Sequence, residues 1–325
     1  MLAVVTGGFG FVGLAICRRL AYEGFDVVAV DRSEPTRLAR RFLDLAVERV
    51  LPLMGDICDS GWHAGAGRPD LLIHAAALTP LGTDEEVERA TEAVAVNVGG
   101  TVEVMRWAAH VRPRRIVHVS SGSVYGAGCG VARLNEDDPH APVSLYGITK
   151  SASERVAVRL AERTGLDLIV ARPTYVYGPM ERPSGARIAM SHVHDWCLAA
   201  HEGRVIEASD LRRTRDYTHA NDIAEAVARL ALLRRPRART FNVSTGVSVR
   251  LSTILRLVLN QFPGAVVRQA PDRIGRRDSR PRMDVGRLDR AAGWWPRTTI
   301  RDGIRLQAAW LRSLSSGLGP ASCPG

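Results

Sequence analysis

The sequence predicts an α/β protein with a doubly wound parallel sheet and a smaller α/β unit toward its C-terminus. Short apolar runs alternate with helical stretches through the first half of the chain. Strands without a polar face are typical of a parallel sheet covered by helices on both faces. A glycine-rich turn also follows the first apolar run and opens the first helix. This order is typical of sheets that bind ligands at the carboxyl ends of their strands.

The individual elements follow in chain order and are joined by right-handed crossovers. We predict strands at 2–5, 26–30, 50–53, 70–74, 115–120 and 167–171. We predict helices at 12–23, 37–48, 85–111 and 146–164.

Beyond Arg172 the alternation breaks, and three prolines mark a loop. The predicted elements that follow are an amphipathic segment at 188–201, a βαβ-like return at 216–233 and 240–243, and a helical tail at 251–325 with a break at 293–296. The chain thus leaves its first domain and revisits it. We predict one domain at 1–172, revisited by about 214–246, and a smaller one at 173–213 and 247–325.

Composition narrows the class of protein. The chain has 325 residues and a net charge of +10, and of its 44 basic residues only Lys150 is a lysine. Its arginine clusters lie in separate segments without interleaved aromatic residues, so we expect no nucleic-acid partner. No apolar run approaches the roughly 20 residues that span a bilayer, and five scattered cysteines indicate reduced thiols. We therefore expect a cytoplasmic protein with no membrane contact.

The glycine-rich turn indicates a dinucleotide site. Gly7, Gly10 and Gly13 would let the backbone turn tightly and approach a pyrophosphate at the start of the following helix. Asp31 comes directly after the next predicted strand, where a carboxylate accepts hydrogen bonds from ribose hydroxyls and repels a 2′-phosphate. This pattern favours NAD as the cofactor. The neighbouring Arg32 keeps NADP open as an alternative.

Further candidates for dinucleotide contacts lie at successive strand ends. Asp56 and Ile57 follow the third predicted strand, and Ala75, Ala76 and Ala77 follow the fourth. Small residues there would let the backbone pass close to the cofactor. With Phe11 and Val12 of the first helix, these residues complete the expected cofactor side of the site.

The catalytic candidates are Tyr146 and Lys150, which share one helix face at positions i and i+4. A tyrosine is a poor base at neutral pH because its ordinary pKa is near 10. A nearby ammonium lowers that pKa and lets the phenolate accept a proton. Ser121 directly follows the fifth predicted strand and would hold the substrate oxygen.

Two other chemistries are disfavoured. His192 and His194 have residue types that bind metals, but two residues on a helix diverge by about 200°, so we expect no metal site. The chain also lacks a G-x-S-x-G elbow, which disfavours serine hydrolysis.

Together these residues resemble the extended short-chain dehydrogenase/reductase class, specifically the NAD-dependent epimerase/dehydratase family. The resemblance covers residues 1–312 and implies a Rossmann fold. Beyond the glycine turn and the Y-x-x-x-K spacing, it rests on NVGGT at 97–101, RPTYVYGP at 172–179, RDYTH at 215–219, FNVSTG at 241–246 and GWWP at 293–296.

The resemblance implies a catalytic triad of Ser121, Tyr146 and Lys150, and further cofactor contacts from Asn97 and Pro173. It also implies a homodimer through helices near 97–110 and 147–163, and a small-molecule substrate held between an NAD-binding first domain and a substrate-binding second domain. In relatives that act on nucleotide sugars, arginines matching Arg215 and Arg276 or Arg277 bind the diphosphate. The predicted substrate contacts are Thr79, Ser121, Ser123, Thr174, Arg187, Arg215 and Arg277.

The chain also departs from the family pattern. Gly122 and Ser123 replace the Asp-Glu pair of the dehydratases, which disfavours dehydration. Thr174-Tyr175 replaces an asparagine that contacts phosphates, and Ala-Ser-Asp at 208–210 replaces Gly-Asp-Gly. Our leading hypothesis is an NAD-dependent sugar epimerase, specifically one for nucleotide sugars. The alternatives are a dehydrogenase of a small hydroxy compound or sugar acid and, more remotely, a non-catalytic dinucleotide-binding protein.

Overall fold

A central sheet of seven strands organises the protein in the computed structural model, which describes residues 1–79, 83–126, 132–271 and 281–315. All neighbouring strands in it run parallel. Their order across the sheet is β11 (Thr240–Val243), β7 (Leu168–Pro173), β5 (Arg115–Val119), β4 (Leu71–His74), β1 (Leu2–Thr6), β2 (Asp26–Asp31) and β3 (Val50–Met54). From β1 the chain adds strands toward β3, and from β4 it adds them toward β11 on the other side of β1. This reversal of strand order between β1 and β4 confirms the predicted doubly wound Rossmann fold.

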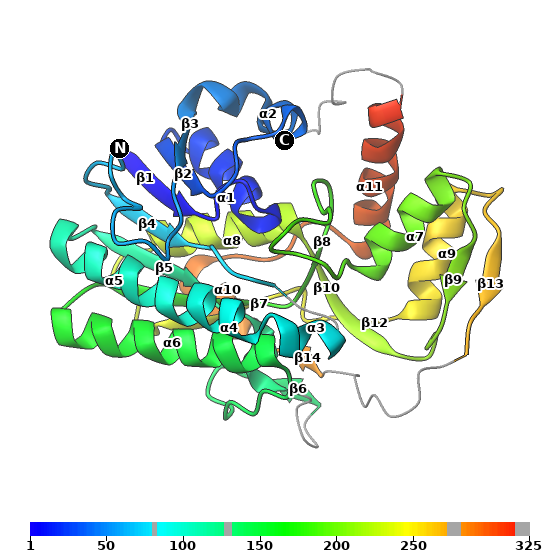
Figure 1. Ribbon diagram of the computed structural model, residues 1–325. Helices are drawn as coiled ribbons and strands as arrows, with labels where there is room; N and C mark the ends of the chain where they lie inside the picture. The colour runs from blue at the N-terminus through cyan, green and yellow to red at the C-terminus, as the bar shows by residue number, and fades with distance from the viewer. Residues whose placement is uncertain (80–82, 127–131, 272–280, 316–325) are drawn as a thin grey trace.

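Helices cover both faces of this sheet. The helices α1 (Phe11–Tyr22), α2 (Arg37–Leu43) and α8 (Ala220–Leu232) lie on one face, and α5 (Gly100–Val111) and α6 (Leu145–Thr164) lie on the other (Figure 1). Successive residues of a strand point to opposite faces. Accordingly Val5 belongs to the core under α1 and α8, whereas Val4 belongs to the core under α5.

Two predicted helices are interrupted. The stretch expected at 85–111 consists of α3 (Thr83–Glu88), α4 (Ala90–Val94), a π-helical turn (Ala95–Gly99) and α5. The turn lies where Asn97 bonds to a neighbouring loop and Gly100 packs closely on Ile57. The helix expected at 37–48 ends at Leu43 because Asp44 has a positive φ of 54°, and a 3-10 turn (Asp44–Arg49) follows.

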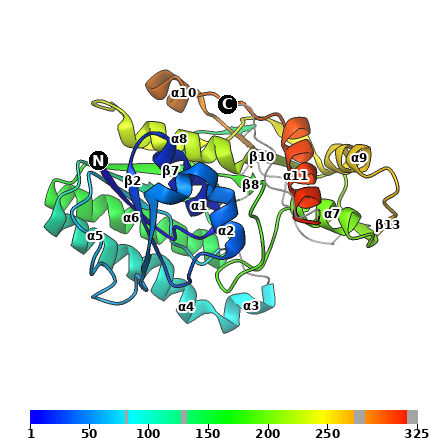
Figure 2. The same cartoon turned by 90° about the horizontal axis from the view of Figure 1, so that it is seen from above.

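Beyond β7 the chain builds a third apolar core. Figures 1 and 2 show α7 (His192–His201), α9 (Leu251–Gln261) and α11 (Ile300–Ser315) gathered at one end of the molecule. Short strands accompany them: β8 (Tyr175–Tyr177), β9 (Ile206–Ala208), β10 (Thr214–His219), β12 (Ser248–Arg250) and β13 (Val267–Gln269). The chain then returns to the central sheet, because α8 packs against α1 and β11 pairs with β7.

The tail is less helical than predicted. Besides α9, α11 and α10 (Gly286–Ala292), it contains β12, β13 and β14 (Arg282–Met283), and β14 pairs with β6 (Arg133–Leu134). Strands of two or three residues are too short to show an alternating pattern. Within the part of the chain that the structure describes, no helix is both long and apolar enough to cross a bilayer.

Candidate active site

A cavity of about 950 Å³ opens at the carboxyl ends of the central strands. Its walls come from the glycine-rich turn, the ends of β2, β4 and β5, the start of α6, and segments that follow β7. The carboxyl ends of parallel strands meet at one edge of the sheet, so residues far apart in the sequence converge there. Most of the predicted site residues share this one cavity.

The glycine-rich turn has the backbone that a pyrophosphate requires. Gly7 has a φ of +68°, and a Cβ atom there would lie 2.7 Å from Ala76 Cα. A Cβ atom on Gly13 would lie 2.0 Å from the Gly7 carbonyl oxygen. Helix α1 begins at Phe11 with Gly10 as its N-cap, and no side chain caps its first amides. Those amides are therefore available to an anion in the cavity.

Asp31 is fixed at the end of β2. Its Oδ2 accepts a hydrogen bond from Phe9 N at 3.0 Å, and its Oδ1 accepts one from Ser33 N at 3.3 Å. Arg32 forms ion pairs with Asp56 at 3.7 Å and with Glu92 at 3.8 Å. The carboxylate of Asp31 thus faces the cavity at the edge where an adenosine ribose would lie, while Arg32 is engaged with two carboxylates.

Replacing Asp31 with Asn is expected to shift the preference from NAD toward NADP. The amide keeps an acceptor for Phe9 N and removes the charge that repels a 2′-phosphate. Loss of one charge-assisted contact corresponds to about a tenfold change in the ratio of the two dissociation constants. Calorimetric Kd values for both cofactors measure this ratio. Equal weakening of both would mean that Asp31 acts by holding the turn.

The other predicted cofactor contacts are divided between the cavity wall and the layer behind it. Phe11, Val12, Asp56, Ile57, Ala75, Ala76, Ala77 and Pro173 line the cavity. Asn97 does not. Its buried amide accepts a hydrogen bond from Leu78 N at 2.8 Å and donates to Leu78 O at 3.0 Å and Thr149 Oγ1 at 2.9 Å. Asn97 therefore ties the loop after β4 to helix α6, next to Lys150.

Ser121, Tyr146 and Lys150 line the same cavity. Lys150 is 2% exposed, and its Nζ donates to Val119 O at 2.8 Å at the end of β5. Ser121 follows β5, and its Oγ caps a 3-10 turn by accepting a hydrogen bond from Ser123 N. Helix α6 begins at Leu145, so Tyr146 stands in its first turn. The helix start and the strand end thus present all three side chains to one space.

Burial sets the protonation of the groups around Lys150. Burial lowers the pKa of Lys150 to about 8, and the charge of Glu154 opposes this shift. Burial, followed by the Lys150 charge, lowers the pKa of His74 to about 3 and that of His118 well below its usual range. Both histidines are therefore neutral near pH 7, whereas Lys150 is largely an ammonium.

The predicted substrate contacts Thr79, Ser123, Thr174, Arg187 and Arg215 also line the cavity. The buried Arg215 guanidinium stacks 4.9 Å from the centre of the Tyr175 ring, and its Nη1 donates to Thr214 O. Arg187 lies 5.2 Å from the centre of the Phe11 ring and pairs with Glu181. Arg276 and Arg277 lie outside the described residues.

Arg182 and Glu86 are among the cavity residues that no sequence pattern indicates. Arg182 Nη2 donates to Phe9 O at 3.4 Å, and burial lowers its pKa. Glu86 Oε1 accepts a hydrogen bond from Leu145 N at 2.9 Å at the start of α6. Both contacts join segments that are far apart in the chain, and neither residue belongs to a motif. The only hint in the sequence is that Arg182 closely follows the motif at 172–179.

The paired histidines of α7 have ordinary partners. His192 Nδ1 is hydrogen-bonded to Tyr217 Oη at 3.0 Å, and His194 Nδ1 contacts Asp195 Oδ1 at 3.0 Å. Among the residues described, no group of three or more His, Cys, Asp or Glu side chains has a metal-binding arrangement.

Comparisons with known proteins agree with this geometry. The UDP-glucose 4-epimerase of Mycolicibacterium smegmatis is 29% identical over 326 residues, which cover 97% of this chain and 100% of that protein. The dTDP-glucose 4,6-dehydratase of Streptomyces niveus is 27% identical, over 100% of this chain and 96% of that protein. The crystal structure of Thermus thermophilus UDP-glucose 4-epimerase in complex with NAD superposes with a TM-score of 0.81 at 27% identity, covering 96% and 99% of the two chains.

A family model described as "NAD dependent epimerase/dehydratase family" matches residues 3–244. This match spans most of the chain and includes the glycine-rich turn, the three catalytic candidates and the return to the central sheet. It confirms the predicted enzyme class and NAD as the cofactor. The chain therefore belongs to the NAD dependent epimerase/dehydratase family.

Proposed function

We propose that the protein is a nucleotide-sugar epimerase that transiently oxidises a hydroxyl to a ketone. The observation that carries the proposal is the shared cavity, which holds the glycine-rich turn together with Ser121, Tyr146 and Lys150. The relatives from Mycolicibacterium smegmatis and Thermus thermophilus, both UDP-glucose 4-epimerases, support the same reaction.

The residues present fit NAD. The uncapped start of α1 suits the pyrophosphate, and the cradle between Gly7 and Ala76 leaves no room for a side chain. Asp31 would hold the adenosine ribose, and Lys150 would donate to the nicotinamide ribose. When bound, NAD would supply a reversible hydride acceptor for the carbinol carbon.

The protein supplies the proton chemistry. Tyr146, as a phenolate, takes the proton of the sugar hydroxyl, and the Lys150 ammonium stabilises that phenolate. The Ser121 hydroxyl donates to the oxygen as it becomes a carbonyl. When the ketone is reduced from its opposite face, Tyr146 returns the proton. A cavity of about 950 Å³ gives the sugar room to turn between the two steps.

The cavity also suggests how the nucleotide part is held. Arg187 and Arg215 line it, and guanidinium groups suit the oxygens of a diphosphate. Gly122 and Ser123 follow Ser121 without a carboxyl group, so we propose epimerisation and not the dehydration of the Streptomyces niveus relative.

The assembly and the division of the chain are part of the same proposal. We propose a homodimer that buries the face of α5 and α6, where Ile148 is 50% exposed. Residues 173–213 and 247–325 form the substrate-binding unit, supported by the separate core of α7, α9 and α11. The described cysteines Cys17, Cys58 and Cys197 are free thiols, which supports a cytoplasmic location.

A panel of UDP- and dTDP-sugars, sugar acids and polyols tests the reaction. With NAD, we expect a nucleotide sugar to be converted into its epimer with no net NADH, because the hydride returns to the substrate. Chromatography identifies the sugar, and absorbance at the NADH band follows the cofactor. Stoichiometric NADH with a sugar acid or polyol would contradict the epimerase and indicate a dehydrogenase. If no compound of the panel reacts, both the epimerase and the dehydrogenase are contradicted.

A further inference from the structure

A buried ion pair joins three elements behind the cavity wall. Glu154 lies one helical turn after Lys150 on α6, Arg172 lies near the end of β7, and each is 4% exposed. Arg172 Nε donates to Glu154 Oε2 at 3.1 Å, and Arg172 Nη2 donates to Oε1. Ser120 Oγ donates to Oε2 at 2.7 Å. One carboxylate therefore connects α6, β7 and the end of β5.

Each of these elements contributes a neighbouring residue to the cavity. Helix α6 carries Lys150, the end of β5 is followed by Ser121, and β7 ends in Pro173. A shift of α6 along the sheet would separate Lys150 from Ser121. The hydrogen bonds from Ser120 and Arg172 to the Glu154 carboxylate oppose that shift, because they tie α6 to the ends of β5 and β7.

Arg172 is held from its other side as well. A guanidinium has five N–H groups, and all five have acceptors here. Nε and one hydrogen of Nη2 face Glu154. The two hydrogens of Nη1 reach Tyr125 Oη at 2.6 Å and Glu136 O at 3.0 Å. The remaining Nη2 hydrogen reaches His140 Nε2 at 2.8 Å. The cation is therefore fully satisfied, as a buried ion pair requires.

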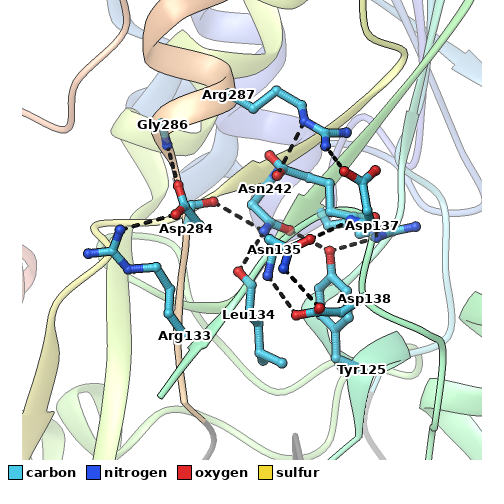
Figure 3. Close-up of polar contacts among 12 residues, drawn as sticks. Tyr125, Arg133, Leu134, Asn135, Asp137, Asp138, Asn242, Asp284, Gly286 and Arg287 are labelled. Carbon is cyan, nitrogen blue, oxygen red and sulfur yellow. Dashed lines mark hydrogen bonds and ion pairs between the residues drawn. The ribbon is translucent and has the colours of Figure 1, made fainter. Parts of the chain in front are cut away.

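The contacts continue toward the C-terminal segment. Figure 3 shows Tyr125 against Asn242, and Tyr125 Oη donates to Asn242 Oδ1 at 2.8 Å. Asn242 Nδ2 in turn donates to Leu134 O and Asp284 O, both at 3.1 Å. Leu134 of β6 and Asp284, which directly follows β14, are thus linked to Arg172 through Asn242 and Tyr125.

The charge of Glu154 faces Lys150 across one turn of α6. Burial disfavours the ammonium form of Lys150, and the Glu154 carboxylate opposes this effect. Neutral histidines flank the amine on β4 and β5. The charged and titratable groups packed around Lys150 and Glu154 are Tyr146 and Arg155 on α6, His74 on β4, His118 on β5, Arg172 on β7, and Tyr125 and His140 in the loops before α6.

We propose that Glu154 is a positioning residue for the reaction: bonded to Arg172 and Ser120, it fixes Lys150 against the end of β5 and supplies the negative charge that faces its ammonium. The catalytic role of Lys150 rests on the proposed function, whereas the effect of Glu154 on the charge of Lys150 does not. The two can therefore fail separately.

The single lysine of this chain allows a direct test. Protein grown with lysine labelled with ¹³C at Cε, and carrying no lysine-containing tag, gives NMR signals from Lys150 alone. We expect the wild-type signal to titrate with a pKa of about 8. In Glu154→Gln the pKa of Lys150 should fall by about one unit or more, because a carboxylate is lost and Arg172 is left without its counter-charge. An unchanged pKa would overturn the proposal.

Two further variants separate positioning from general stability. Glu154→Asp keeps the charge but draws it back by one methylene, so the pKa should fall by less than in Glu154→Gln. If Glu154→Gln does not fold, an unchanged pKa in Glu154→Asp overturns the proposal instead. Arg115→Met removes a comparably buried arginine that pairs with Asp167 at 2.8 Å at the opposite end of β5. That control should lose stability without moving the Lys150 titration, and an equal shift there would contradict the assignment.

Kinetics on the substrate found with the panel complete the test. Glu154→Gln should lower kcat at least tenfold with KM within threefold, and should move the alkaline fall of kcat to lower pH by about the same one unit as the Lys150 signal. In Glu154→Asp, both kcat and the pH of its alkaline fall should lie between the values of Glu154→Gln and the wild type. If the wild type converts no nucleotide sugar but the NMR shifts occur, only the proposed function fails. If the wild type is active and the shifts do not occur, only the role of Glu154 fails.

Discussion

Replacing Tyr146 with Phe is expected to lower kcat by roughly a thousandfold, within the usual range for a lost general base. The change removes the phenolic oxygen and keeps the ring, so the start of α6 and the cavity wall retain their packing. The NAD content of the purified protein should stay near that of the wild type, because the glycine-rich turn and Asp31 are untouched. Steady-state kinetics with the accepted substrate measure kcat. Chromatography of the bound cofactor measures the NAD content.

Tyr22→Phe is the matched control for this change. Tyr22 ends α1 on the surface, where it is 54% exposed, and it does not line the cavity. It should leave kcat and NAD content unchanged. If Tyr146→Phe loses NAD, the phenol holds the cofactor. If it keeps the wild-type kcat, the phenol does not take part in the reaction, and another residue must transfer the proton.

The cavity could be anticipated from the sequence because it follows from the topology. Once apolar strands alternate with helices, the sheet must be parallel, and the residues after each strand must meet at one edge. The positions of Asp31, Ala75 and Ser121 in the cavity could be predicted because each follows a predicted strand. Those of Tyr146 and Lys150 could be predicted from their i, i+4 spacing on one helix.

The site residues that the sequence does not predict depend on contacts between distant segments of the chain. Arg182 touches the carbonyl of Phe9, and Glu154 accepts hydrogen bonds from Ser120 and Arg172. No local pattern marks such pairs, because each partner alone resembles a surface charge. The same holds for Asn97, whose motif indicated importance but not that its amide would bond to protein groups behind the cavity wall.

Some predicted element boundaries are wrong because they depend on contacts with distant parts of the chain. The long helix predicted at 85–111 has continuous apolar spacing, and the π-helical turn that divides it depends on tertiary contacts of Asn97 and Gly100. Strands β13 and β14 are stabilised by pairing with β9 and β6, which lie far away in the chain. Their two or three residues carry no period of their own.

Replacing Gly13 with Ala is expected to weaken NAD binding strongly. The new Cβ would lie 2.0 Å from the carbonyl oxygen of Gly7, which is backbone and cannot rotate away. Helix α1 or the turn must move, and with it the amides that face the pyrophosphate. Overpacking of this kind costs about 1–3 kcal/mol, which corresponds to roughly a 5- to 150-fold increase in Kd. Calorimetric titration with NAD measures the change, and the NAD content of the purified protein should fall in parallel.

Gly61→Ala separates the clash from a general effect of glycine substitution. A Cβ on Gly61 would meet no atom within 4 Å, and Gly61 does not line the cavity. Its variant should bind NAD as the wild type does. Because the Gly13 clash is with the turn and not with the catalytic groups, nucleotide-sugar turnover at saturating NAD should be far less affected than the Kd for NAD. Loss of kcat with an unchanged Kd would mean that the turn positions the reacting groups and that the dinucleotide is held elsewhere in the cavity.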